Sequence, residues 1–260
     1  MGRGIARMLW YKEEGAMKNP WEDFDSTAPR QVHAADSEAF DFFNSQLDRS
    51  RSISRENFRL QHHVSPQPYF GNQNGKLLLL LANPAYLPGS DIDEETPEIR
   101  HLFDLSRRHR LTDTPLVYFR PELQKTQGYK WWAKRLNRLI EAAGLEVVTN
   151  QVFSVELHAY KSQNYKRIKS SFATQEYTRW LVRESMSRGA YIILGRSENE
   201  WLSAIDGLSS YRNLVRLNSV QNAAVTPKNM PEGKFEDVVE AIRHEHQVCL
   251  QTKVRAGYQA

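Results

Sequence analysis

The sequence of 260 residues contains one cysteine, Cys249, and no apolar stretch long enough to cross a membrane. A single thiol excludes a disulfide framework within the chain and any cysteine-based zinc cluster. The first residues, Met-Gly-Arg-Gly-Ile-Ala-Arg, also lack the apolar core and the small-residue cleavage site of a secretory signal. We therefore expect a soluble protein of the cytoplasm that has no membrane partner.

Glycine-rich phosphate loops of the Gly-x-Gly-x-x-Gly or Walker type are absent as well, which argues against a nucleotide cofactor. His244-Glu245-His246 lacks the i, i+4 spacing of a helical zinc pair. The acidic run Asp91-Ile-Asp93-Glu94-Glu95 could ligate Mg²⁺ and leaves a metal-dependent phosphoesterase as one alternative. Such a run is more typical of solvated charge before a helix N-terminus, so we expect no metal and no cofactor.

The charge balance leans slightly towards nucleic acid. The 35 lysines and arginines exceed the 31 aspartates and glutamates, and the isoelectric point is about 9.1. Surfaces that bind phosphate need such an excess of cations, although many basic proteins bind no nucleic acid.

Strands and helices alternate along most of the chain. Residues 1–35 show no sustained period and predict an irregular N-terminal extension, and residues 36–260 predict a single domain. Helices are expected at 36–47, 97–109, about 131–143, 174–188, near 201–205 and from 231 onwards. Strands are expected at 77–81, within 147–157, at 191–195 and at 214–217. This order predicts an α/β fold of three αβα layers around a central, mainly parallel, four-stranded sheet.

The run Leu77-Leu-Leu-Leu-Leu81 followed by Ala82-Asn83-Pro84 is the most informative segment. Five leucines indicate a fully buried strand of a parallel sheet, so the polar Asn83 emerges at its carboxyl end. Ligands bind at that edge in open α/β sheets. The plain alternative for Asn83 is a turn residue that bonds its own backbone. The other three strands end in loops that contain Glu156 to Tyr160, Gly195-Arg196-Ser197, and Asn218 to Asn229.

This pattern resembles the uracil-DNA glycosylase superfamily over about residues 65–245, in the form of its Asn-Pro branch for mismatched thymine and uracil. The resemblance implies that Asn83 positions the water that attacks the N-glycosidic bond and that Asn218 completes the catalytic set. A neutral amide is no general base, so such a site depends on positioning and electrostatics. The partner implied is double-stranded DNA, from which the target base is flipped out, and we expect the enzyme to act as a monomer.

Two departures from the uracil-specific pattern indicate the substrate. Ala85 stands where uracil enzymes have a tyrosine wall, so a 5-substituted pyrimidine could enter. Glu156 stands where the family often has an asparagine, and an ionised carboxylate, which only accepts hydrogen bonds, suits the cytosine amine. His158 is the reader if the alignment is shifted by two residues, and an ion pair is the plain alternative for Glu156. The resemblance then implies excision of a glucosylated hydroxymethylcytosine from phage DNA, with an abasic site as the product.

The remaining candidates are assigned by the same resemblance. Tyr86 and Phe103 would contact the flipped base, with Tyr118 and Phe119 as further stacking candidates, although such aromatics more often belong to a core. The candidate DNA contacts are Lys161, Ser162, Gln163, Asn164, Lys166, Arg167, Lys169, Gln221, Asn222, Thr226, Lys228 and Asn229. A non-catalytic binder that senses modified DNA or nucleotides is the alternative function.

Overall fold

The computed structural model describes residues 17–89, 91–169, 171–220 and 223–257. Its strands are β1 (Tyr69–Gly71), β2 (Leu77–Leu81), β3 (Val152–Glu156), β4 (Tyr191–Leu194) and β5 (Leu214–Arg216). Its helices are α2 (Ser37–Asp48), α3 (Asp91–Glu94), α4 (Pro97–Arg107), α5 (Gln127–Ala143), α6 (Leu145–Gln151), α7 (Gln175–Ser187), α8 (Glu198–Ala204) and α9 (Lys234–Gly257). The helices predicted at 36–47, 97–109 and 174–188 are confirmed as α2, α4 and α7, within two residues at each end.

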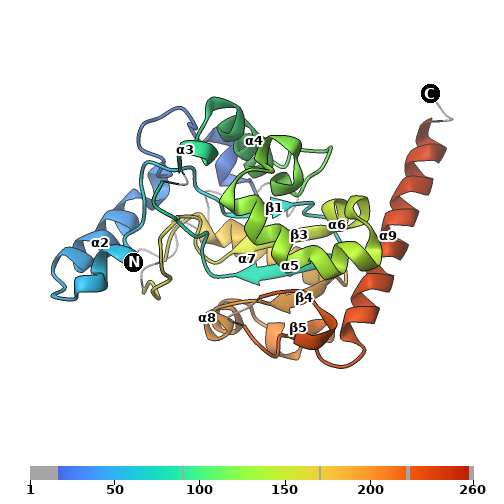
Figure 1. Cartoon of the computed structure of the whole chain (residues 1–260). Coiled ribbons are helices and arrows are strands. Elements are labelled where there is room, and N and C mark those ends of the chain that lie inside the picture. Colours follow the sequence, from blue (N-terminus) through green and yellow to red (C-terminus); the bar gives the residue numbers. More distant parts are fainter. Residues whose placement is uncertain (1–16, 90, 170, 221–222, 258–260) are drawn as a thin grey trace.

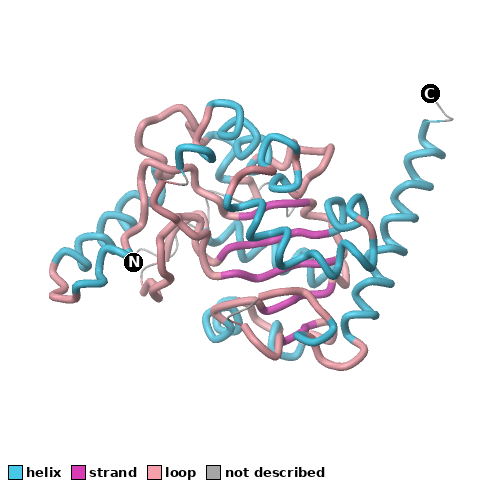
Figure 2. Tube along the Cα trace, in the orientation of Figure 1, coloured by secondary structure: helices cyan, strands magenta, loops and turns pink. Residues whose placement is uncertain are grey.

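The sheet has five strands in the order β1-β3-β2-β4-β5, with β2 at its centre (Figure 2). The four predicted strands are present and pair in parallel, which confirms a mainly parallel α/β sheet. The predicted number of four is wrong, because β1 adds an antiparallel edge strand beside β3. β1 escaped prediction because three residues are too few to show an alternating pattern. It ends at Gly71, whose φ of 96° and close approach to the carbonyl of Val152 exclude a side chain.

The leucines of β2 divide between two cores. Leu77, Leu79 and Leu81 pack into the core that includes side chains of α4, α5 and α9. Leu78 and Leu80 pack into the core that includes side chains of α2, α7 and α8. Successive residues of a strand point to opposite faces, so an unbroken leucine run requires helices on both faces. Figure 1 shows this arrangement, with α5 and α7 on opposite sides of the sheet.

Residues 17–36 form two short 3-10 turns, Pro20–Asp23 and Ala34–Asp36, separated by irregular chain. Trp21 is fully buried in the core that contains Leu78 and Leu80. Asp36 accepts hydrogen bonds from the Tyr160 hydroxyl at 2.7 Å and from the backbone and hydroxyl of Thr174 at 3.0 and 2.7 Å. This buried network attaches the segment to the loop that follows β3.

Among the described residues, no helix is both long and apolar enough to span a bilayer.

Candidate active site

The carboxyl ends of β2 and β3 are held together beyond the last paired residues. The amides of Leu157 and His158 donate to the carbonyls of Leu81 and Ala82 at 3.1 and 3.0 Å. The indole nitrogen of Trp201 in α8 also donates to Leu81, at 2.8 Å. These contacts fix the two loops side by side where the sequence predicts a site.

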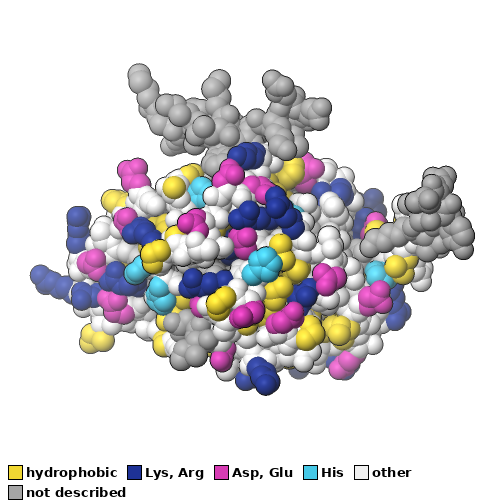
Figure 3. Space-filling view, turned by 90° about the horizontal axis from the view of Figure 1, so that it is seen from above, with side chains coloured by type: hydrophobic (Ala, Val, Ile, Leu, Met, Phe, Trp, Pro, Cys, Tyr) yellow, Lys and Arg dark blue, Asp and Glu magenta, His cyan; other side chains and the backbone are white. Residues whose placement is uncertain are grey.

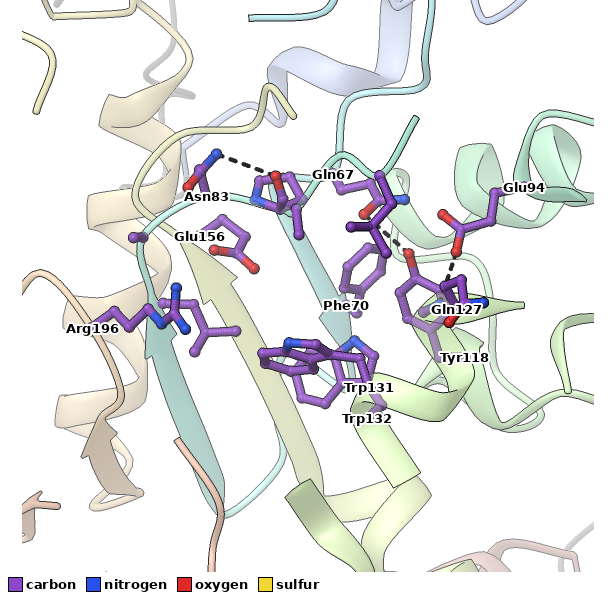
Figure 4. Close-up of a pocket in the computed structure, with 16 residues that line it drawn as sticks. Gln67, Phe70, Asn83, Glu94, Tyr118, Gln127, Trp131, Trp132, Glu156 and Arg196 are labelled. Carbon is purple, nitrogen blue, oxygen red and sulfur yellow. Dashed lines mark hydrogen bonds between the residues drawn. The ribbon is translucent and has the colours of Figure 1, made fainter. Parts of the chain in front are cut away.

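A cavity opens between these loops and helix α5 (Figure 4). One end, which we call the Glu156 end, carries Asn83, Glu156 and Arg196. The opposite end, which we call the Gln67 end, carries Gln67, Glu94, Tyr118 and Gln127. Between them lie the aromatic side chains of Phe70, Trp131 and Trp132. Ala82, Pro84, Ala85, Leu87, Gly128 and Leu81 complete the lining. The cavity therefore combines an apolar aromatic surface with polar groups at both ends, which is typical of small-ligand sites.

Asn83 is half-buried, and its side-chain amide forms hydrogen bonds through the nitrogen alone among the described residues. The nitrogen Nδ2 donates to Ser162 Oγ at 2.8 Å and to the carbonyl of Pro84 at 3.2 Å. The oxygen Oδ1 accepts no hydrogen bond from the described residues. The amide therefore presents an acceptor that can orient a water molecule. The backbone bond expected of a plain turn residue is present as well, as the contact with Pro84.

Glu156 is the last residue of β3 and is 4% exposed. Its Oε2 is buried and has no hydrogen-bond partner among the described residues. Burial raises the pKa of the Glu156 carboxyl to about 8, although the charge of Arg196 acts to lower it. At neutral pH the group is therefore mainly the neutral acid, which both donates and accepts. This protonation state differs from the ionised, purely accepting carboxylate expected from the sequence, because burial disfavours the charged form.

The Gln67 end contains a second buried polar atom without a partner. Gln67 is 2% exposed, and its Oε1 accepts a hydrogen bond from the Tyr118 hydroxyl at 3.1 Å. That bond fixes the amide, and its nitrogen Nε2 has no partner among the described residues. A buried donor without a partner is costly, and such atoms in a cavity indicate where a ligand could bind.

Glu94 and Lys161 form an ion pair of 3.0 Å beside this end, with side chains 6% and 4% exposed. The other carboxylate oxygen of Glu94 accepts from the amide of Gly128 at 2.9 Å. Gly128 has no room for a side chain, because a Cβ would lie 2.0 Å from the Tyr118 ring. The ring of Tyr118 thus lies directly against the first turn of α5.

The structure brings four of the candidate residues to the cavity, namely Asn83, Ala85, Glu156 and Tyr118. Ala85 is exposed, and its neighbour Tyr86 turns towards His63, with ring centroids 5.8 Å apart. Phe103 and Phe119 are buried in the core and do not line the cavity.

His158 lies elsewhere. It lines a separate pocket with Tyr165, Arg179 and Glu200. Its Nδ1 accepts from the Gln175 amide at 2.8 Å, and Gln175 is oriented by the backbone amide of Phe172, which donates to its Oε1. Burial lowers the pKa of His158 to about 3, so the ring is neutral. Glu156, and not His158, therefore faces the cavity.

The candidate DNA contacts from the loop after β3 fall into two groups. Lys161 and Ser162 are buried, where they hold Glu94 and Asn83. Gln163, Asn164, Lys166, Arg167 and Lys169 are exposed. The side chains of this second group are accessible to an external partner, although Arg167 approaches Glu200 at 4.0 Å and Lys166 lies over the Phe58 ring.

Side chains of the loop after β5 form hydrogen bonds within the loop itself. Asn218 lies outside the cavity lining, and its amide donates to the carbonyls of Lys228 and Met230 at 3.1 and 3.4 Å. Thr226 accepts from the amide of Asn229 at 3.2 Å, the Asn229 side chain bonds the Ser219 backbone, and Lys228 is exposed. Gln221 and Asn222 lie outside the described residues.

Gln67, Phe70, Trp131 and Gln127 were not anticipated as site residues. Trp131 lies at the start of the helix predicted at about 131–143. Phe70 belongs to the edge strand β1, which was not predicted, and Gln67 lies two residues before that strand. The sequence predicted the Gly195-Arg196 loop at the carboxyl edge of the sheet. In the structure, Arg196 of this loop lines the cavity at the Glu156 end.

Basic and acidic side chains are interspersed over the face seen in Figure 3, rather than gathered into a field of one sign. Within the described ranges, no group of three or more histidine, cysteine, aspartate or glutamate residues is placed to hold a metal ion. In comparisons with protein-family models, curated proteins and solved structures, no match to this chain was found.

Proposed function

We propose that the chain is a monofunctional DNA glycosylase that hydrolyses the N-glycosidic bond of a flipped, 5-substituted cytosine in double-stranded phage DNA. The substituent we propose is a glucosylated hydroxymethyl group, and the product is an abasic site. The observation that carries the proposal is the amide of Asn83, held by Ser162 at the end of the central strand with its oxygen left as an acceptor.

The chemistry requires a placed water and a stabilised leaving group. Cleavage of a glycosidic bond passes through a sugar with oxocarbenium character, which a weak nucleophile can trap if it is well positioned. Asn83 Oδ1 would accept a hydrogen bond from that water and aim its oxygen at C1′. Because an amide does not take up a proton at ordinary pH, Asn83 contributes position and not basicity.

The cavity supports a flipped base with a polar substituent. In this proposal the Watson–Crick edge of the base lies at the Glu156 end and its ring contacts Phe70 or Trp131. The substituent at position 5 extends past the small side chain of Ala85 towards the Gln67 end. There Gln67 Nε2, which has no partner among the described residues, and the Gln127 side chain would form hydrogen bonds with sugar hydroxyls.

DNA would contact the exposed part of the loop after β3 and the loop after β5. Gln163, Asn164, Lys166 and Lys228 are exposed and suited to phosphate contacts. Flipping the base out of the stack is necessary, because the sugar bond cannot be reached inside the duplex.

The proposal is tested with purified protein and duplex oligonucleotides that contain glucosylated hydroxymethylcytosine, hydroxymethylcytosine or cytosine. We expect abasic sites and free base from the glucosylated duplex only. Asn83→Ala should abolish base release while its melting temperature stays unchanged. Asn74→Ala, in the exposed turn at the other end of β2, is the matched control and should be fully active.

A non-catalytic sensor of modified DNA is the second candidate, favoured by the same unpartnered buried groups in the cavity. It predicts tighter binding of the glucosylated duplex with no abasic site after long incubation. Base release that is unaffected by Asn83→Ala would contradict the assigned role of Asn83.

A further inference from the structure

One acidic side chain of the cavity is left without a structural function. Glu156 lies at the carboxyl end of a central strand, lines the cavity, and has a buried oxygen with no hydrogen-bond partner among the described residues. A buried polar group without a partner destabilises the fold, so its presence in a cavity calls for a role in the bound state.

We propose that Glu156 is the general acid of the reaction, and that its carboxylic proton passes to N3 of the cytosine ring as the base departs. This inference rests on the proposed function. It assigns to Glu156 a chemical step that is additional to holding the base.

The surroundings keep the carboxyl protonated before the base arrives. Burial raises its pKa to about 8. The charged and titratable groups that line the same cavity are Arg196, Tyr118 and Glu94. Arg196 lowers the Glu156 pKa and only partly offsets burial. Lys161 pairs with the Glu94 carboxylate and balances its charge. Tyr118 is a buried phenol whose pKa is raised by burial, so neither residue adds an unbalanced charge.

A neutral carboxyl matches the edge of cytosine in two contacts. Its hydroxyl donates to N3, and its carbonyl oxygen accepts from the exocyclic amine. When the C1′–N1 bond breaks, its electron pair moves onto the base while the proton moves from Glu156 to N3. The base then leaves as a neutral tautomer. Water forms the new bond to C1′ and loses a proton to solvent, and the Glu156 carboxylate takes a proton back from solvent.

The need for this acid distinguishes cytosine from uracil. A uracil ring already carries a proton at N3 and departs as an anion stabilised by two carbonyl groups. A cytosine ring has only one carbonyl group and no proton at N3, so its anion is a poorer leaving group. An acid near N3 therefore accelerates loss of a cytosine far more than loss of the corresponding uracil.

The test uses Glu156→Gln in the full chain, because an amide keeps one donor and one acceptor but transfers no proton. Single-turnover rates are measured from pH 5.5 to 9.5 on duplexes with glucosylated hydroxymethylcytosine or glucosylated hydroxymethyluracil. Glu98→Gln, an exposed site on α4, is the matched control. Binding of the modified duplex is measured in parallel as a readout independent of turnover.

We expect the wild-type rate on the cytosine substrate to fall at alkaline pH. Glu156→Gln should lose about 100-fold or more at pH 7 and show no alkaline fall. Its rate on the uracil substrate should stay within about tenfold, and its affinity for duplex within about threefold of wild type.

Equal losses on both substrates, or a cytosine rate within about threefold of wild type, would overturn the acid role while leaving the glycosylase proposal intact. If wild-type protein releases no base from either duplex, the proposed function itself fails. A melting temperature for Glu156→Gln equal to that of Glu98→Gln excludes misfolding as the cause of any loss.

Discussion

The amide nitrogen of Asn83 lies 2.8 Å from the hydroxyl oxygen of Ser162, and this hydroxyl donates in turn to the carbonyl of Asn164 at 2.8 Å. The direction of this chain is fixed because a carbonyl can only accept, so the Ser162 hydrogen points to Asn164 and its oxygen receives the Asn83 amide. Asn83 Oδ1 is then the acceptor of the amide, and it receives no hydrogen bond from the residues that the structure describes. Two loops that lie 79 residues apart thus set the orientation of one amide.

Ser162→Ala should lower the rate of base release by about fivefold, because removal of one neutral hydrogen bond costs about 1 kcal/mol and frees the amide to rotate. Single-turnover kinetics on the glucosylated duplex measure the effect, with duplex affinity expected to be unchanged. Ser45→Ala, at a half-buried position in α2 where the hydroxyl donates to the carbonyl of Phe42, serves as the control. An unaltered rate in Ser162→Ala would show that Ser162 does not orient Asn83 during the reaction.

Ala85→Tyr should exclude the bulky substituent. Ala85 is exposed at the cavity, and a tyrosine there would occupy the path that the proposal assigns to the 5-position. Activity on the glucosylated duplex should fall by more than 100-fold if the loop cannot move, since overlap with the substituent then costs more than the about 1–3 kcal/mol of ordinary overpacking. Affinity for unmodified duplex should be retained.

Full activity of Ala85→Tyr on the glucosylated duplex would show that Ala85 does not face the 5-position. Equal loss of activity and of unmodified-duplex binding would mean that the variant damages the fold or the DNA surface instead.

Gln67→Leu should reduce selectivity for a sugar-bearing base. The substitution removes the unpartnered donor at the Gln67 end and also the acceptor of the Tyr118 hydroxyl, so the double variant with Tyr118→Phe is needed to relieve that hydroxyl. We expect the ratio of kcat/KM for glucosylated over plain hydroxymethylcytosine to fall about tenfold in the double variant. A ratio equal to that of wild type would remove Gln67 from substituent recognition.

The leucine run shows which part of the fold the sequence pattern predicts. Five consecutive leucines predict a buried central strand because only two covering layers of helix can bury both faces, and β2 is that strand. The antiparallel β1 was missed because it consists of only Tyr69, Phe70 and Gly71, and its pairing with β3 depends on residues more than 80 positions away. Short edge strands are set by such tertiary pairing and not by local periodicity.

The same contrast holds for the site. The positions of Asn83 and Glu156 at one site could be predicted from the sequence. Each lies at or just after the carboxyl end of a parallel strand, and these strand ends meet at the same edge of the sheet. The roles of Lys161 and Ser162 could not be predicted. A lysine in a polar loop is expected to be exposed to solvent, and the sequence does not show that Glu94 lies beside Lys161 in the fold. The protonation of Glu156 also depends on burial, which adjacent sequence does not reveal.

Two histidines whose pKa is lowered by burial, His109 and His158, should make the fold sensitive to mild acid. Burial lowers the pKa of His109 to about 4 and that of His158 to about 3, against about 6.5 in an unfolded chain. Between pH 6.5 and 4 the unfolded chain therefore binds more protons than the native chain. Stability falls as the pH falls, by up to about 1.4 kcal/mol per pH unit for each histidine.

His158→Asn isolates one of these contributions, because Oδ1 of asparagine can replace Nδ1 as the acceptor of the Gln175 amide. Urea unfolding at pH 7, 6, 5 and 4.5 should give a free energy of unfolding that decreases less steeply in His158→Asn than in wild type. His244→Asn, on the exposed side of α9, should follow wild type. If the curves of His158→Asn and His244→Asn run parallel, His158 takes up a proton in the native state as readily as in the unfolded chain, and burial does not lower its pKa.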